Sequence, residues 1–124
     1  MFRSYCRLVR KHSLTQFSKP VQLAMMQIDS DLTADLSLAA IAAEQGLSAS
    51  YLSALFKKET GQTLTDYVNE RRVGTAKELL QHTRLQVQTV AQYCGILDVH
   101  YFARMFKKYT GMTPKEYREK RRIQ

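Results

Sequence analysis

The chain has 124 residues, the length of one domain or of two very small lobes that share an element. Its composition is ordinary for a globular protein, with 44% hydrophobic and 24% charged residues, and excludes collagenous or proline-rich chains. The charge is unusual, because 19 lysines and arginines against 11 acidic residues give +8. A charge of this sign favours a polyanionic partner, either nucleic acid or an acidic membrane surface. No run of about 18 apolar residues is present, so the sequence predicts no membrane-spanning helix.

The residue types that carry catalysis or bind metals are sparse. The two cysteines, Cys6 and Cys94, lack the spacing of a zinc site, and a reduced cytosolic compartment is the default expectation for such a chain. The three histidines, His12, His82 and His100, show no metal-ligand spacing either. No glycine-rich phosphate loop and no Ser/His/Asp grouping occurs. The sequence therefore predicts no enzyme, no catalytic residue, no metal and no cofactor.

The N-terminal segment is basic and amphipathic. An apolar stripe at helical spacing is flanked by arginines, and no acidic residue precedes Asp29. We expect a helix and a linker over residues 1–18. Organellar transit peptides share this acid-poor composition, so that alternative is open at this point. The stripe consists of Phe2, Tyr5, Cys6 and Val9.

Serine caps and terminating glycines divide the next part of the chain into helices. The first runs from about Pro20 to Asp31, and the next two cover residues 38–45, "LAAIAAEQ", and 49–60, "ASYLSALFKKET". The expected caps are Ser18, Ser37 and Ser48, and the expected stops are Gly46 and Gly61.

A long helix follows from Leu64 to about Gln81, with Thr63 as its cap. The same grammar then recurs over residues 87–94 and 99–110, with stops at Gly95 and Gly111, and a last helix extends from Pro114 to about Arg122. No segment alternates with period two over strand length, so the fold class is all-α.

An internal repeat links the two halves. "FKKETG" at 56–61 recurs as "FKKYTG" at 106–111, and ten of the 22 positions from 51 to 72 are identical fifty residues later. Upstream the offset is 49, so one extra residue lies between Gly95 and Tyr101. A helix, a glycine turn and a second helix form the helix-turn-helix pattern, and two matched copies joined by one helix make it specific.

A helical projection of each second helix separates a core face from an outward face. The residues expected to face the core are Tyr51, Leu52, Leu55, Phe56, Tyr101, Phe102, Met105, Phe106 and Tyr109. The candidate base-contacting residues on or near the outward face are Ser50, Ser53 and Ala54 in the first copy and Val99, His100, Ala103 and Arg104 in the second. The candidate phosphate-contacting residues are Ser48, Lys57, Lys58, Lys107 and Lys108.

Each candidate also has a simpler interpretation. Lysine runs are commonly solvated surface, and His100 could be an ordinary surface histidine. Arg104 has no acidic residue three or four positions away to pair with along the helix. Because Arg104 has no such partner along its helix, the sequence favours its contacting a ligand, here the edge of a DNA base.

The two halves, 36–72 and 87–122, resemble the paired helix-turn-helix motifs of the AraC/XylS-type bacterial transcription regulators. The resemblance covers Pro20 to Arg122, and Ile96 stands where that family usually has phenylalanine in the turn. Its most specific part is the set Ala91, Gly95, Asp98, Tyr101, Phe102, Phe106, Lys107, Gly111, Pro114, Tyr117 and Arg118.

The resemblance implies double-stranded promoter DNA as the partner, with helices 49–60 and 99–110 in successive major-groove segments. It implies lobes at 19–62 and 83–124 joined by a connecting helix at 63–82. It further implies an upstream sensor or receiver domain in the full-length protein, contact with RNA polymerase and a bacterial, cytoplasmic setting, which argues against a transit peptide. The competing hypothesis is a helical protein-interaction module that uses the amphipathic N-terminal helix and does not read DNA.

Overall fold

The computed structural model describes residues 16–123, and over this range the chain forms helices and no strands. The N-terminal stripe, Cys6 and His12 lie outside the described residues. Contacts group the described residues into two units, one of residues 16–30 and 37–64 and the other of residues 31–36 and 65–123. The helices are α2 (Lys19–Ser30), α3 (Leu38–Glu44), α4 (Ala49–Thr60), α5 (Leu64–His82), α6 (Val87–Tyr93), α7 (Val99–Thr110) and α8 (Pro114–Ile123).

Local hydrogen bonds at the helix ends explain why the boundaries follow the sequence pattern so closely. The hydroxyls of Ser37 and Ser48 accept the backbone N–H groups of Ala40 and Tyr51, at 3.2 and 3.1 Å. These bonds satisfy donors that the first turn of a helix leaves without partners. At the other end, Gly61 and Gly111 both have φ of 82° and close α4 and α7, as the sequence predicts.

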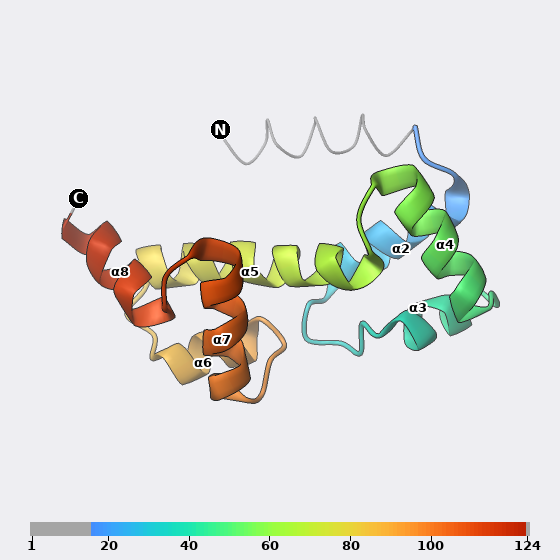
Figure 1. Ribbon diagram of the computed structural model, residues 1–124. Coiled ribbons are helices and arrows are strands. Elements are labelled where there is room, and N and C mark those ends of the chain that lie inside the picture. The colour runs from blue at the N-terminus through green and yellow to red at the C-terminus, as the bar shows by residue number, and fades with distance from the viewer. Residues whose placement is uncertain (1–15, 124) are drawn as a thin grey trace. The chain divides into compact units, whose positions relative to one another are not determined.

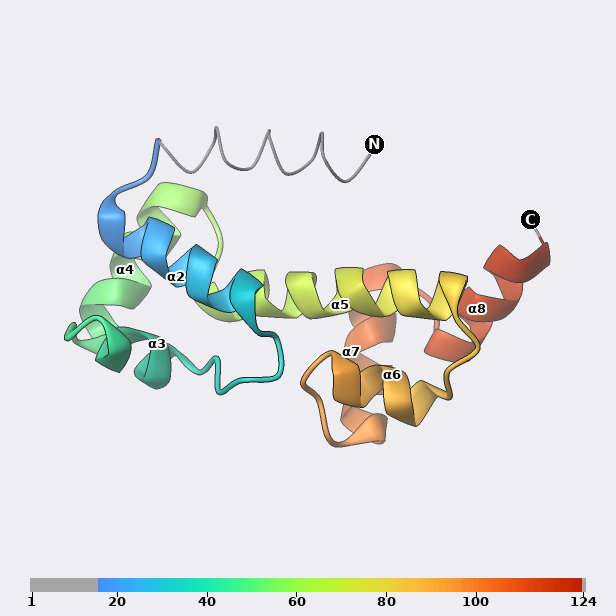
Figure 2. The same ribbon diagram turned by 180° about the vertical axis from the view of Figure 1, so that it is seen from behind.

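The first unit is a three-helix lobe in which α2 packs against α3 and α4, as Figures 1 and 2 show from opposite sides. All three helices contribute to its apolar interior. The buried side chains are Val21, Ala24, Met25 and Ile28 on α2, Ile41 and Ala42 on α3, and Leu52 and Phe56 on α4. Ala42 is small and buried, so α3 and α4 can pack closely against each other. This packing fixes the position of α4 relative to α3.

The second unit repeats this plan with α5, α6 and α7, and α8 packs against α7 (Figure 1). In its core, Phe106 lies between two aromatic rings, with centroids 5.8 Å from Phe102 and 5.5 Å from Tyr117. The core also takes residues from α5, so the long helix forms part of this lobe as well as a connection. These α5 residues are Val73, Ala76 and Leu80.

Both helix-turn-helix turns use a glycine in the left-handed region, with φ of 69° at Gly46 and 88° at Gly95. The second turn, residues 94–98, is one residue longer than the first, residues 45–48, which places the extra residue of the repeat in the turn. Ile96 is buried beside this turn, as expected for an apolar plug.

Residues 31–36 lie against the second turn. A Cβ atom on Gly95 would stand 2.0 Å from the carbonyl oxygen of Leu32, so only glycine permits this approach. The same oxygen accepts a hydrogen bond from Arg72 Nη2 at 3.1 Å. Burial lowers the pKa of the Arg72 guanidinium, and the nearby Cys94 and Tyr101 side chains oppose that shift. The carbonyl of Leu32 thus joins the segment 31–36 to both α5 and the turn before α7.

One sequence-based expectation is wrong, because Tyr51 and Tyr101 do not face the core. Their side chains are 53% and 46% exposed, whereas Phe56 and Phe106 are fully buried. Residues five positions apart on a helix differ by about 140° in direction. The tyrosines therefore lie on the flank of each second helix.

The two lobes also differ at the far end of their second helices. Glu59 accepts hydrogen bonds from the backbone N–H and the hydroxyl of Ser18, at 2.8 and 2.7 Å, and so caps the start of α2. At the matching position Tyr109 packs against the core and donates its hydroxyl to Asp66 at 3.1 Å. The same repeat position thus holds a carboxylate that hydrogen-bonds to α2 in the first lobe and an aromatic ring that packs against the core in the second.

Candidate nucleic-acid interface

The outward face of α7 combines an exposed cation with small side chains. His100 and Arg104 are exposed, while Val99 and Ala103 are half-buried between them and the core. The backbone of the first turn is fixed, since Asp98 Oδ1 accepts the N–H groups of His100 at 2.9 Å and Tyr101 at 3.2 Å. These contacts hold the N-terminal end of α7 in one conformation and leave its polar side chains pointing into solvent.

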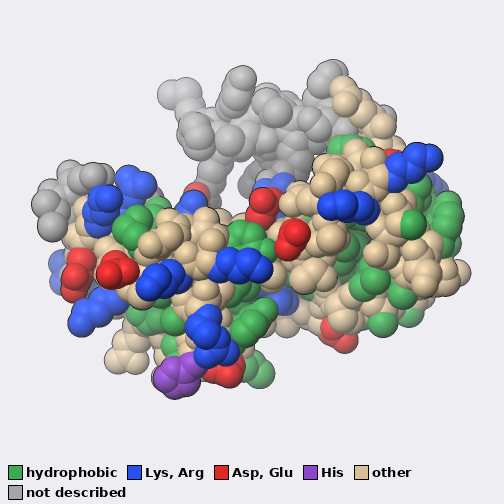
Figure 3. Space-filling model, in the orientation of Figure 1, with side chains coloured by type: hydrophobic (Ala, Val, Ile, Leu, Met, Phe, Trp, Pro, Cys, Tyr) green, Lys and Arg blue, Asp and Glu red, His purple; other side chains and the backbone are tan. Residues whose placement is uncertain are grey.

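The charge on this face combines an acidic cap with basic side chains along the helix. The N–H groups of Tyr101 and then His100 lower the pKa of the Asp98 carboxyl, and the nearby His100 and Arg104 side chains act in the same direction. Asp98 is therefore ionised at neutral pH. Farther along, Lys and Arg side chains lie over α7 and α8 on the face shown in Figure 3, with acidic side chains among them over α8.

The outward face of α4 has the same frame with smaller side chains. Ser50 and Ala54 are exposed and Ser53 is half-buried. None of these three carries a charge or paired donors, so this face offers less for direct base recognition than α7 does. The two helices begin and end at equivalent positions of the repeat. The difference in recognition capacity between α4 and α7 therefore comes from their side chains and not from their backbones.

Lysines lie in the last turn of both second helices, and all four are exposed. Lys57 and Lys58 are in α4, and Lys107 and Lys108 are in α7. The Lys108 ammonium lies 5.9 Å above the Tyr109 ring, within the range of a cation–π contact. Ser48 is exposed as well, and because its oxygen accepts the Tyr51 N–H, its own O–H is left to donate.

Two exposed residues on these helices were not predicted as surface, namely Tyr51 and Tyr101. Their flank position is visible in a helical projection, so the signal was present in the sequence. Their aromatic character, which is typical of core residues, outweighed it.

Other chemistry-bearing groups do not form a second site in the described part of the chain. Cys94 is buried, and burial raises the pKa of its thiol to about 11, so it stays protonated and unreactive at neutral pH. Among residues 16–123 no cluster of histidines, cysteines and carboxylates is suited to a metal ion. None of the described helices combines the length and apolarity needed to cross a membrane.

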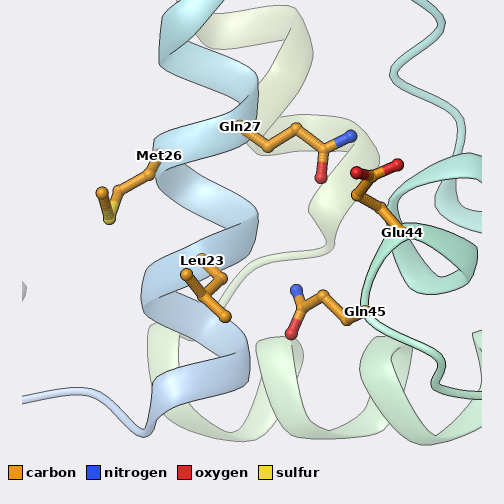
Figure 4. Close-up of a pocket in the computed structure, with 5 residues that line it drawn as sticks. All are labelled: Leu23, Met26, Gln27, Glu44 and Gln45. Carbon is orange, nitrogen blue, oxygen red and sulfur yellow. The ribbon is translucent and has the colours of Figure 1, made fainter.

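A cavity of about 680 Å³ opens in the first unit between α2 and α3 (Figure 4). Its lining includes the partly exposed Leu23 and Met26, and Gln45, whose side chain donates to the Pro20 carbonyl at 3.0 Å. Among the described residues that line it, Glu44 is the one carboxylate and none is a cation. It is therefore unsuited to the phosphates of a nucleic acid.

Comparison with known proteins places this geometry among helix-turn-helix domains. A family model described as "Helix-turn-helix domain" matches residues 41–120. The regulatory protein PocR of Salmonella typhimurium is 33% identical over 87 residues, which are 70% of this chain and 29% of PocR. The transcriptional activator RhaR of Escherichia coli K12 is 30% identical over 108 residues, 82% of this chain and 38% of RhaR. The chain thus spans less than two-fifths of the length of these relatives.

Among solved structures, the C-terminal domain of AraT, a response regulator from Geobacillus stearothermophilus, superposes with a TM-score of 0.83. The two sequences are 33% identical, and the match covers 85% of this chain and 88% of that domain. The two-lobed all-α fold is therefore shared along most of both chains.

Proposed function

The chain belongs to the AraC-type family of helix-turn-helix transcription regulators, and from this premise we propose that it binds specific sequences in double-stranded DNA. This family is a class of DNA-binding regulators and not of enzymes. The observation that carries the proposal is the matched exposed face on α4 and α7, polar at the N-terminal end and basic in the last turn. A helix with this polarity fits a major groove, with base edges at its centre and phosphates at its rims.

In the proposed complex α7 reads most of the base sequence. Arg104 can donate two hydrogen bonds to O6 and N7 of a guanine, and His100 can donate or accept at a neighbouring base edge. Val99 and Ala103 would offer apolar contact to a thymine methyl group.

The first helix would contribute less sequence information. Ser50 and Ser53 can each make one hydrogen bond to either partner of a base pair, and Ala54 can contact a thymine methyl group. Recognition by α4 would therefore depend mainly on phosphate contacts and on the shape of the DNA.

The phosphate contacts would come from the ends of both helices. Lys57, Lys58, Lys107 and Lys108 supply positive charge, and the Ser48 hydroxyl can donate to a phosphate oxygen. Neutralising phosphates releases counterions, so this part of the affinity falls steeply with salt.

The complete protein would combine this domain with others. Because PocR and RhaR are far longer than the matched region, and AraT is a response regulator, we infer an upstream sensor or receiver domain. RNA polymerase is the further partner that such a regulator would contact at a bacterial promoter, in the cytoplasm.

A gel-shift titration on random duplex DNA at several salt concentrations tests the proposal against the interaction-module alternative. A DNA-binding domain should shift the duplex, with log K falling linearly as log salt rises. A protein-interaction module that uses the N-terminal segment would give no shift at low salt, and that result would refute the proposal.

A further inference from the structure

We propose that Tyr51 and Tyr101 are paired phosphate-contacting residues, one on the flank of each DNA-reading helix, which donate their hydroxyls to the DNA backbone. The inference rests on the proposed DNA binding and adds to it a pair of contacts of defined chemistry. It starts from the finding that both rings are about half exposed where a core position was expected.

The two tyrosines hold equivalent places in the repeat. Each is the third residue of its helix, and its backbone N–H is bonded to the cap, Ser48 in α4 and Asp98 in α7. Side chains on a helix lean toward its N-terminus, which is the end that a major groove admits first. Each ring is thus held at the edge of the face that carries the proposed base-contacting residues.

The two phenol groups form no hydrogen bond within the described chain, although Tyr101 lies near enough to the Arg72 guanidinium to interact with it electrostatically. Of the less exposed tyrosines, Tyr67 accepts a hydrogen bond from Arg71 at 3.1 Å, and Tyr109 donates to Asp66. Within residues 16–123 neither Tyr51 nor Tyr101 forms such a bond through its hydroxyl. Their hydroxyls are therefore available to a ligand outside the chain.

The neighbours of the tyrosines indicate which ligand. Positions i, i+3 and i+7 share one stripe of a helix, and here the stripe is Tyr–Ala–Lys in α4 and Tyr–Arg–Lys in α7. All six side chains are exposed. The middle residue differs between the lobes, as base reading requires, while the outer two are the same. Both lobes need phosphate contacts, and these do not depend on the DNA sequence. Tyrosine hydroxyls commonly make such contacts. The two stripes are Tyr51, Ala54 and Lys58, and Tyr101, Arg104 and Lys108.

The test replaces each tyrosine by phenylalanine, which removes only the hydroxyl. Dissociation constants for Tyr51→Phe, Tyr101→Phe and the double variant are measured by fluorescence anisotropy at several salt concentrations. The two DNAs are a site selected from a random pool by binding to the wild-type chain (the selected site) and a random duplex. Tyr93→Phe is the matched control, because Tyr93 is 60% exposed on α6 and lies outside both stripes.

A lost hydrogen bond to a charged oxygen should weaken binding by about tenfold or more per hydroxyl. The loss should be equal on both DNAs, and since the hydroxyl is neutral the slope of log K against log salt should not change. Tyr93→Phe should bind as the wild type does.

Three outcomes would overturn the proposal. Unchanged affinity would show that the hydroxyls do not touch DNA, and a loss confined to the selected site would make them base readers. A wild-type chain that binds neither DNA would refute the DNA-binding proposal itself. That outcome differs from the first one, in which the wild type and the phenylalanine variants all bind equally well.

Discussion

Gly95 has little freedom to change, because two independent constraints meet there. Its φ of 88° lies in the left-handed region, and an added Cβ would stand 2.0 Å from the Leu32 oxygen and 2.9 Å from the Leu32 carbonyl carbon. Backbone atoms cannot move aside as the end of a long side chain can. Gly61 has a similar φ of 82° with nothing within 4 Å of the added atom, so it isolates the conformational cost alone.

Gly95→Ala should therefore lower the free energy of unfolding by clearly more than Gly61→Ala, for which conformational strain alone predicts about 1–2 kcal/mol. Chemical denaturation followed by circular dichroism measures both variants. Equal losses would mean that the contact between Leu32 and the second turn does not constrain the lobe.

Arg104 is the residue on which the proposed sequence preference depends most. Arg104→Ala should relax the preference at one base pair, at a cost of about 1–3 kcal/mol, and leave binding to random DNA nearly intact. Ser53→Ala should change little, since a single hydroxyl discriminates weakly. The measurement is affinity for the selected site and for that site with each base pair changed in turn.

Two results would contradict this assignment. One is a larger loss for Ser53→Ala than for Arg104→Ala, and the other is an equal weakening of all sequences by Arg104→Ala. Either result would show that Arg104 of the second lobe is not the main base-reading residue.

At the scale of the elements, ionised carboxylates hold three helix starts. Hydrogen bonds lower the pKa of each: from the Tyr101 N–H to Asp98 at α7, from the Thr113 N–H to Glu116 at α8, and from the Ser18 hydroxyl to Glu59 at α2. A lowered folded-state pKa adds stability above the ordinary value, which is 3.8 for the aspartate and 4.5 for the glutamates. That stability is lost as the pH falls through the lower folded-state values.

The melting temperature should therefore stay constant from neutral pH to about pH 5 and fall at lower pH. Asp98→Asn keeps a good helix cap but does not titrate, so its melting temperature should match the wild type at pH 7 and fall less in acid. Thermal melts by circular dichroism provide the comparison. An identical acid loss in the variant would exclude the Asp98 cap as a contributor.

The helices could be predicted from the sequence because their ends are set by local chemistry. Ser37, Ser48 and Asp98 bond N–H groups only two or three residues away, and glycines in the left-handed region close α4 and α7. Because the two halves repeat, the helix boundaries and outward positions predicted for one lobe also apply at the matching residues of the other. With it came the outward positions of Ser50, Ala54, His100 and Arg104, all of which are exposed.

The rest depends on contacts between residues far apart in the chain. Glu59 finds Ser18 across 41 residues, and Arg72 finds Leu32 across 40, and neither pair has a sequence signal. Tyr51 and Tyr101 were misassigned for a different reason. Their flank position follows from a helical projection of each second helix, but aromatic side chains are more typical of core positions, and this favours the wrong assignment.

At the scale of the whole molecule, the charge of +8 should act mainly through the lysines at the ends of the second helices. Replacing both Lys57 and Lys107 by alanine should flatten the slope of log K against log salt by about 1–2 units, if each neutralises one phosphate. The double variant Lys19→Ala, Lys77→Ala removes the same charge from α2 and α5 and should leave the slope unchanged. Equal slopes for both double variants would assign Lys57 and Lys107 to solvent.

The central claim is that one chain reads DNA with two unequal helices. Selection of bound sequences from a random pool, followed by footprinting of the selected site, tests it most directly. Two reading helices on one face of DNA contact segments about 10 bp apart, so one chain should protect a non-palindromic site of roughly two turns. The strongest base preference should lie in the half contacted by α7. Failure to enrich any sequence, or enrichment of a palindrome that needs two chains, would contradict the account.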